Sequence, residues 1–209
     1  MLGSGRSRLL RTIAGVHARD AGEVKVHGRA VRASVLGAVR AGVVFVPEER
    51  KTEGLVLPLA VRANTTLADL PAVAPRGWLD PGRERRSFEE DRERLGIRVS
   101  SPDQAAWTLS GGNQQKIVLA KWLRTRPRVL LLDEPTRGID VGAKYEIYTI
   151  IQELAAQGKG VILISSELPE LLGICDRIYA LSAGRITGEV DVKEAHPEEL
   201  MQYMTKEKE

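Results

Sequence analysis

Two adjacent carboxylates at the end of an apolar run are the residues of this sequence best suited to phosphate and metal chemistry. Asp133 and Glu134 directly follow Val129–Leu132, a run that predicts a buried parallel strand delivering both acids to the carboxyl end of a sheet. Burying two acids side by side is costly unless a metal or a proton offsets their charge. The alternative is that the pair only caps the following helix.

A serine-glycine turn one helix earlier supplies the complementary chemistry. Ser110, Gly111 and Gly112 open a helical segment, so backbone N–H groups and a hydroxyl are available to an anion. Such a turn alone is an ordinary loop feature. The turn followed by the paired acids at this spacing is far more specific than the turn alone.

The segments 109–116 (LSGGNQQK) and 128–136 (RVLLLDEPT) together resemble the signature and Walker B motifs of ABC-type ATPases. Within that family, NQQK at 113–116 and VPEERKTEGL at 46–55 are typical of the C-terminal module of carbohydrate importers (ribose, xylose or galactose type) with two fused ATP-binding modules. The resemblance runs from Gly3 to about Gly188. It implies an α/β P-loop NTPase of the ABC type, with a mainly parallel sheet, helices on both faces and an inserted helical subdomain.

The resemblance also implies roles for the motif residues. Asp133 would organise Mg²⁺, and Glu134 would polarise the attacking water. Asp140, which follows the Gly138 turn, stands in the family's D-loop and would help couple two facing nucleotide sites.

The signature segment is expected to act in trans. Ser110, Gly111 and Gly112 would contact the γ-phosphate of ATP held by a partner's P-loop, and Gln114 is assigned to the same nucleotide-binding set. Glycine is expected here because a β-carbon would block close backbone approach.

The half-site that this chain builds for itself departs from the family pattern. Gly3, Ser4, Gly5, Arg6 and Ser7 resemble the end of a P-loop, with Ser7 also a metal ligand, but Arg6 stands where a lysine is expected. Arginine keeps the charge and replaces a compact ammonium with a planar fork. Nucleotide binding is compatible with this change, whereas hydrolysis geometry is in doubt.

Two further positions differ in the same half-site. Glu48 replaces the Q-loop glutamine as a metal ligand, and Ser166 replaces the switch histidine among the catalytic residues. Serine cannot carry the charge that histidine places near a γ-phosphate. The sequence therefore predicts that the helix start at Ser110–Gly112, called the tip below, is intact, whereas the half-site that the chain builds for itself is altered. The composite site completed by the tip would then hydrolyse ATP, and the composite site built on this chain's own P-loop segment would mainly bind nucleotide.

The chain organisation follows the motifs. We expect a partial ATP-binding core at 1–53, a helical subdomain at 54–108 and the remaining core at 109–209. The expected strands are 23–27, 42–46, 129–133, 161–165, 177–181 and 185–190. The expected helices are 9–14, 33–41, 83–95, 110–123, 141–156, 167–172 and 197–204, the charged helix 83–95 having a solvated face held by i,i+4 pairs. The family's N-terminal β region and P-loop strand are expected to be missing.

Composition argues against some classes of binding partner. The 209 residues carry a net charge of +3 and one cysteine, and no basic stripe with interleaved aromatics indicates nucleic acid. No apolar stretch is long enough to span a bilayer. The resemblance implies ATP and Mg²⁺ as cofactors. It implies three partners: a second ATP-binding module, a transmembrane permease, and a periplasmic or lipid-anchored sugar-binding protein. The expected location is the cytoplasmic face of the plasma (inner) membrane, peripheral through the permease.

Two other interpretations compete with the importer. A truncated, non-catalytic remnant would bind nucleotide weakly at most. A soluble ABC ATPase acting on DNA or ribosomes would carry long heptads or a basic linker, and neither occurs here.

Overall fold

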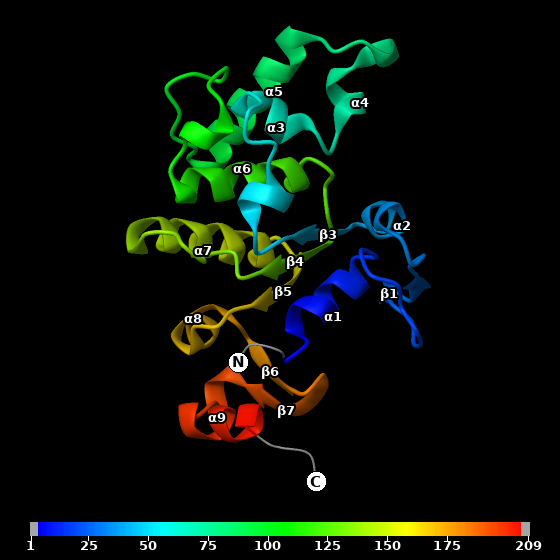
Figure 1. Cartoon of the computed structure of the whole chain (residues 1–209), viewed down its shortest axis with the longest axis vertical. Helices are drawn as coiled ribbons and strands as arrows, with labels where there is room; N and C mark the ends of the chain where they lie inside the picture. Colours follow the sequence, from blue (N-terminus) through cyan, green and yellow to red (C-terminus); the bar gives the residue numbers. More distant parts are fainter. Residues whose placement is uncertain (1–3, 206–209) are drawn as a thin grey trace.

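A three-stranded parallel sheet lies at the centre of the molecule, in the computed structural model that describes residues 4–205 (Figure 1). Its order is β3 (Val43–Val46), β4 (Val129–Asp133), β5 (Gly160–Ile164). In this register Asp133 is paired with Ile164. Continuous apolar strands form because both faces are covered, which confirms the predicted α/β architecture with a parallel sheet.

Helices cover both faces of this sheet, as predicted. Leu130 and Leu132 join the apolar cluster that includes α6 (Gly111–Leu123) and α7 (Val141–Ala156). Leu131, which points to the opposite side because side chains alternate along a strand, packs in a second cluster with α1 (Arg6–Ile13) and α2 (Val35–Arg40).

The segment between β3 and α6 is mainly helical, and Figure 1 shows it at one end of the molecule. Val61 and Phe88 are fully buried here, in the same apolar cluster as Leu130 of the sheet. The helical region and the sheet therefore share one core, while the predicted boundaries at residues 54 and 108 stay predictions. Its elements are η1 (Arg50–Gly54), α3 (Val61–Thr66), α4 (Leu70–Val73), η2 (Pro75–Gly77), α5 (Pro81–Leu95) and η3 (Ala106–Thr108).

The charges on α5 differ from the prediction. Within the described residues, the ion pairs that join two residues of this helix or its cap have i,i+3 rather than i,i+4 spacing. Moreover, Glu84 and Asp91 are buried, and they pair with Arg62 and Arg124 of neighbouring helical segments. The expected i,i+4 pairing was therefore wrong, whereas the helix does present an exposed charged face beside the two acids that pair with other elements.

The remaining strands are antiparallel. The single strand expected at 23–27 is a hairpin of β1 (Lys25–Val26) and β2 (Arg29–Ala30), whose turn residues His27 and Gly28 both have positive φ. Near the C-terminus, β6 (Arg177–Ser182) pairs with β7 (Arg185–Asp191). The helices here are α8 (Leu168–Ile174), η4 (Val192–Glu194) and α9 (Pro197–Thr205). No helix in residues 4–205 is both long and apolar enough to cross a membrane.

Candidate functional site

The N-terminus of α1 is held against the turn between β6 and β7. Gly5 has φ +89° and precedes the helix, and a β-carbon on it would lie 3.3 Å from Gly184 Cα. The Ser4 carbonyl accepts a hydrogen bond of 3.0 Å from the Gly184 amide. The start of α1 is thus fixed, with the first-turn N–H groups that suit a phosphate. Gly3 lies outside the described residues.

Ser7 and Asp133, two of the residues predicted to bind metal, lie together in the structure. The Ser7 hydroxyl donates to Asp133 Oδ1 at 3.1 Å. Asp133 is fully buried, and its Oδ2 has no hydrogen-bond partner in the described structure. Burial raises the pKa of this carboxyl, opposed by the Ser7 hydrogen bond and reinforced by neighbouring Glu134.

This pair fits a Mg²⁺ ion chemically. A hydroxyl and a buried carboxylate oxygen without a partner are hard oxygen donors, the type that Mg²⁺ prefers. Residues 4–205 contain no group of three or more His, Cys, Asp or Glu side chains arranged for a metal. Mg²⁺ at Ser7 and Asp133 would therefore complete its shell with water and phosphate oxygens, as it commonly does.

Glu134 and Ser166, the two predicted catalytic residues, also lie together. The Ser166 hydroxyl donates to Glu134 Oε2 at 3.1 Å. Glu134 has φ +46°, a region that residues other than glycine rarely occupy and that is found preferentially at functional sites. Its amide donates to the Ile164 carbonyl at 3.0 Å, so the end of β5 helps to hold the acid in place.

Arg6 points toward the same strand end. Its guanidinium Nη1 donates to the Ser165 carbonyl at 3.2 Å. Arg6 is therefore engaged with the segment that follows β5, and its contact with phosphate stays a prediction.

Glu48 has a different partner from the one expected. It forms an ion pair with Arg137, four residues beyond Asp133. Arg50 donates to the carbonyls of Arg137 and Gly138 at 2.7 and 3.2 Å. The segment after β3 is thus joined to the loop after β4, while metal binding by Glu48 remains untested.

The tip at Ser110 is exposed, and the two glycines that follow it lie close to side chains of other segments. Ser110 caps α6, its hydroxyl accepting from the Asn113 amide at 3.4 Å. A β-carbon on Gly111 would lie 2.8 Å from Arg50 Nη2, and one on Gly112 would lie 2.5 Å from Ala143 Cβ. Gly112 is therefore required for close packing of α6 against α7, a reason that the sequence did not reveal, whereas the flexible Arg50 side chain can move away from Gly111.

Asp140 and Gln114 have structural contacts in this chain. Asp140 caps α7 by accepting from the Ala143 amide at 2.9 Å. Gln114 is buried, and its amide donates to the Ala106 carbonyl at 3.2 Å. Their roles toward nucleotide stay predictions.

Glu170 is the residue that the sequence analysis missed. This buried carboxylate accepts from Thr136 at 3.0 Å, from Ser165 at 2.6 Å, from Lys144 at 3.0 Å and from Tyr148. Burial alone would raise the pKa of Glu170, but these donors lower it below its ordinary value. The sequence signal was an acid set among apolar residues in 168–174. Glu170 joins the loop after β4 to the end of β5, the two segments that carry the candidate catalytic pair.

The fold and this arrangement define an ATP-binding cassette. The structure resembles a nucleotide-free ATP-binding cassette from an ABC transporter with a TM-score of 0.78, covering 99% of this chain and 82% of that chain at 22% identity. It also resembles the ADP conformation of another such cassette, with a TM-score of 0.75, 98% of this chain and 81% of that chain covered, at 23% identity. At these identities the likeness establishes the fold.

The family follows from the sequence match. The family model for ABC transporters matches residues 2–137, and the chain belongs to this family.

Three bacterial relatives are similar over nearly the whole chain. The L-arabinose transport ATP-binding protein AraG of Geobacillus stearothermophilus is 49% identical over 99% of this chain and 41% of its own length. The ribose import ATP-binding proteins RbsA of Bacillus subtilis and Halalkalibacterium halodurans are 45% and 44% identical, each over 98% of this chain and 42% and 41% of their own lengths. The chain thus spans about two fifths of the length of these relatives.

Proposed function

We propose that this chain is an ATP-binding module of a bacterial carbohydrate importer, of the kind that couples ATP binding and hydrolysis to sugar uptake. The relatives named for arabinose and ribose transport support the substrate class. The observation that carries the proposal is the exposed Ser110 hydroxyl at the start of α6. The two glycines that follow it carry no side chains of their own, and the nearby Arg50 guanidinium adds positive charge beside Gly111, so a phosphate is favoured at the backbone here.

In its own half-site, the chain uses the start of α1 to bind nucleotide phosphates. The segment 4–7 supplies backbone N–H groups, while Arg6 supplies positive charge. Ser7 and Asp133 would hold Mg²⁺, which would supply positive charge beside the phosphates. Glu134 accepts a proton from the attacking water, and Ser166 fixes the orientation of Glu134 through their 3.1 Å hydrogen bond.

The Ser110–Gly112 tip acts in a second nucleotide site, across an interface. There it meets the terminal phosphate held by the P-loop of another ATP-binding module. Because Arg6, Glu48 and Ser166 alter only the chain's own half-site, the site completed by the tip is the one that turns over efficiently. The nucleotide site that the chain builds from its own segment 4–7 binds nucleotide and hydrolyses it slowly.

The partners follow from this assignment. They are an ATP-binding module with an intact P-loop, a transmembrane permease on whose cytoplasmic side the chain is held, and a sugar-binding protein outside the membrane. The helical region between β3 and α6 passes the motion of the modules to the permease. The particular sugar is set by the permease and the binding protein, since no residue of this chain contacts it in this scheme.

The test is nucleotide binding and ATP hydrolysis by this chain, alone and with an added N-terminal module from an AraG- or RbsA-type protein. We expect binding but little turnover alone, and a large increase in turnover with the module. A chain that binds ATP weakly and stimulates no partner would instead be a non-catalytic remnant, an outcome favoured by the substitutions at Arg6 and Ser166. Fast turnover by the chain alone would contradict the need for a partner.

A further inference from the structure

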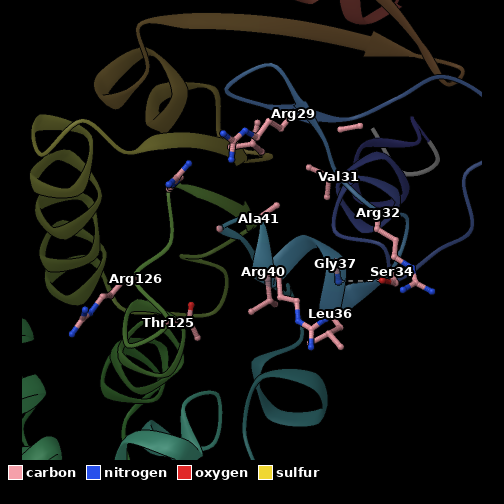
Figure 2. Close-up of a pocket in the computed structure, with 15 residues that line it drawn as sticks. Arg29, Val31, Arg32, Ser34, Leu36, Gly37, Arg40, Ala41, Thr125 and Arg126 are labelled. Carbon is pink, nitrogen blue, oxygen red and sulfur yellow. Dashed lines mark hydrogen bonds between the residues drawn. The ribbon is translucent and has the colours of Figure 1, made fainter.

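A basic hollow of about 550 Å³ lies between the β1–β2 hairpin, α2 and the segment that joins α6 to β4. Figure 2 shows residues from these three parts of the chain around it. Five arginines line the hollow, and its described lining contains no acid. They are Arg29, Arg32, Arg40, Arg126 and Arg128.

The concentration of charge here is unusual for this chain. The five positive charges exceed the net charge of +3 of the whole sequence, so the remainder is net acidic. All five side chains are exposed, and none forms an ion pair within residues 4–205, whereas acids elsewhere are paired with Arg62, Arg124 and Arg137. A concave surface lined by one sign of charge focuses its potential and concentrates ligands of the opposite sign.

The backbone holds part of this lining in a defined position. Arg126 has φ +53°, a strained conformation for a residue other than glycine. The Arg128 amide donates to the Gly42 carbonyl at 2.8 Å, and a β-carbon on Gly42 would lie 3.1 Å from Arg128 Cγ. Val31, which is buried, contributes to the apolar part of the lining. The hollow is therefore built on the packed ends of two strands.

We propose that this hollow is a second anion site, which binds a small molecule carrying two or more phosphate groups. Arginine forms paired hydrogen bonds with phosphate oxygens through its planar fork. A volume of about 550 Å³ is in the range of small-molecule sites.

The hollow is separate from the proposed ATP site. It lies beside Gly42 and Arg128, just before β3 and β4 begin, whereas Asp133 stands at the far end of β4. A strand of this length separates the two by roughly 13 Å or more. A ligand in the hollow would contact the sheet that also carries the candidate catalytic residues.

The test is titration of the intact chain with inorganic tripolyphosphate, followed by calorimetry and by NMR of backbone amides. We expect shifts at residues 40–42 and 125–128, and a dissociation constant weakened roughly tenfold by Arg126→Gln or Arg40→Gln. The matched control is Arg76→Gln. Arg76 is likewise exposed, has φ +59° and lacks an ion pair in the described structure, but lies in η2 of the helical region. It should change binding less than about twofold.

Two further ligands identify the chemistry. Citrate carries clustered carboxylates, and a glutamate-rich peptide is an acidic macromolecule; both should bind more weakly than tripolyphosphate. Absence of shifts at 125–128, equal weakening by Arg76→Gln, or tighter binding of the peptide would each overturn the proposal. Shifts confined to Ser7 and its neighbours would also overturn it, because they would assign the anion to the ATP site alone.

Discussion

The two halves of the candidate nucleotide machinery are built by different means. The chain's own half-site is made of side chains: the Ser7 hydroxyl on buried Asp133, and the Ser166 hydroxyl on Glu134. The tip depends instead on close packing, because a β-carbon on Gly112 would lie 2.5 Å from Ala143 Cβ of α7. A site of the first kind can change its chemistry by substitution and keep its shape, whereas one of the second kind cannot.

One loop serves both halves. Residues 134–140 begin at the candidate catalytic acid and end at Asp140, the cap of α7. On the way, the Gly138 carbonyl lies 3.2 Å from where a β-carbon on Gly111 would be. The two halves are therefore in contact through this loop. Substitutions in one half or the other can separate their contributions to stability and to ATP turnover.

The largest effect is expected from Glu170→Gln, which should disrupt the half-site that this chain builds for itself. The substitution removes the charge that accepts from Thr136, Ser165 and Lys144, and should lower the free energy of unfolding by about 2–4 kcal/mol at pH 7. Because the folded-state pKa of Glu170 is depressed below its ordinary value of 4.5, its contribution is present above that pH and lost as the pH falls through the folded pKa. Urea unfolding from pH 7 to pH 3 measures this.

The matched control for Glu170 is Glu167→Gln. Glu167 also pairs with Lys144 but its side chain is 57% exposed, so we expect a change under about 1 kcal/mol. Equal losses from the two substitutions would refute a special role for the buried network.

Gly112→Ala tests the close packing at the tip. Its β-carbon would lie 2.5 Å from Ala143 Cβ, so α6 and α7 must separate, at a cost of about 1–3 kcal/mol. Gly173→Ala is the control, since nothing lies within 4 Å of that position in α8, and alanine there should stabilise by about 0.5 kcal/mol. Thermal unfolding of both variants separates packing from helix propensity. A neutral Gly112→Ala would show that the tip tolerates a side chain.

Asp133→Asn should have opposite effects on stability and binding. Burial raises the folded-state pKa of Asp133 above its unfolded value. As the pH rises through the interval between these two pKa values, the free energy of unfolding falls, because the buried carboxyl must lose its proton. Asparagine should therefore stabilise the chain by about 1 kcal/mol at pH 7, with little difference in acid, and should abolish Mg²⁺-dependent nucleotide binding. Exposed Asp176→Asn is the control for both measurements. Loss of stability without loss of binding would exclude Asp133 as the metal ligand.

Ser166→Ala is expected to have the smallest effect on stability. It deletes one exposed hydrogen bond to Glu134, worth about 0.5 kcal/mol. In an assembly with a partner module, total ATP turnover should fall less than about threefold, because the altered half-site contributes little. A severe loss would show that this half-site carries the turnover.

The strands and long helices could be predicted because their patterns are local. Strand 129–133 and helix 141–156 were found at their observed bounds, since apolar residues and the Asp140 cap mark them. The resemblance assigned Ser166 and Glu134 to one catalytic set, but the hydrogen bond between them was not predicted and is seen only in the structure. The hairpin partner β2 has only two residues and leaves no periodic signal, and α3 and α4 are too short to show one.

Contacts between distant segments could not be predicted. The donors of Glu170 are 5 to 34 residues away in the sequence, so only the folded chain brings them together. The reason for Gly112 was equally hidden, because Ala143 belongs to another helix. The basic hollow combines three segments whose arginines are unremarkable in sequence.

The most direct test of the account compares Ser110→Asp with Glu134→Gln in an assembly with an N-terminal module that has an intact P-loop. Aspartate keeps the helix cap but places a negative charge where the partner's γ-phosphate should lie. We predict that Ser110→Asp leaves the chain's stability unchanged and lowers ATP turnover by about a hundredfold, while Glu134→Gln retains most of it. Full turnover in Ser110→Asp, or equal loss in both variants, would contradict the claim that the tip completes the partner's nucleotide site.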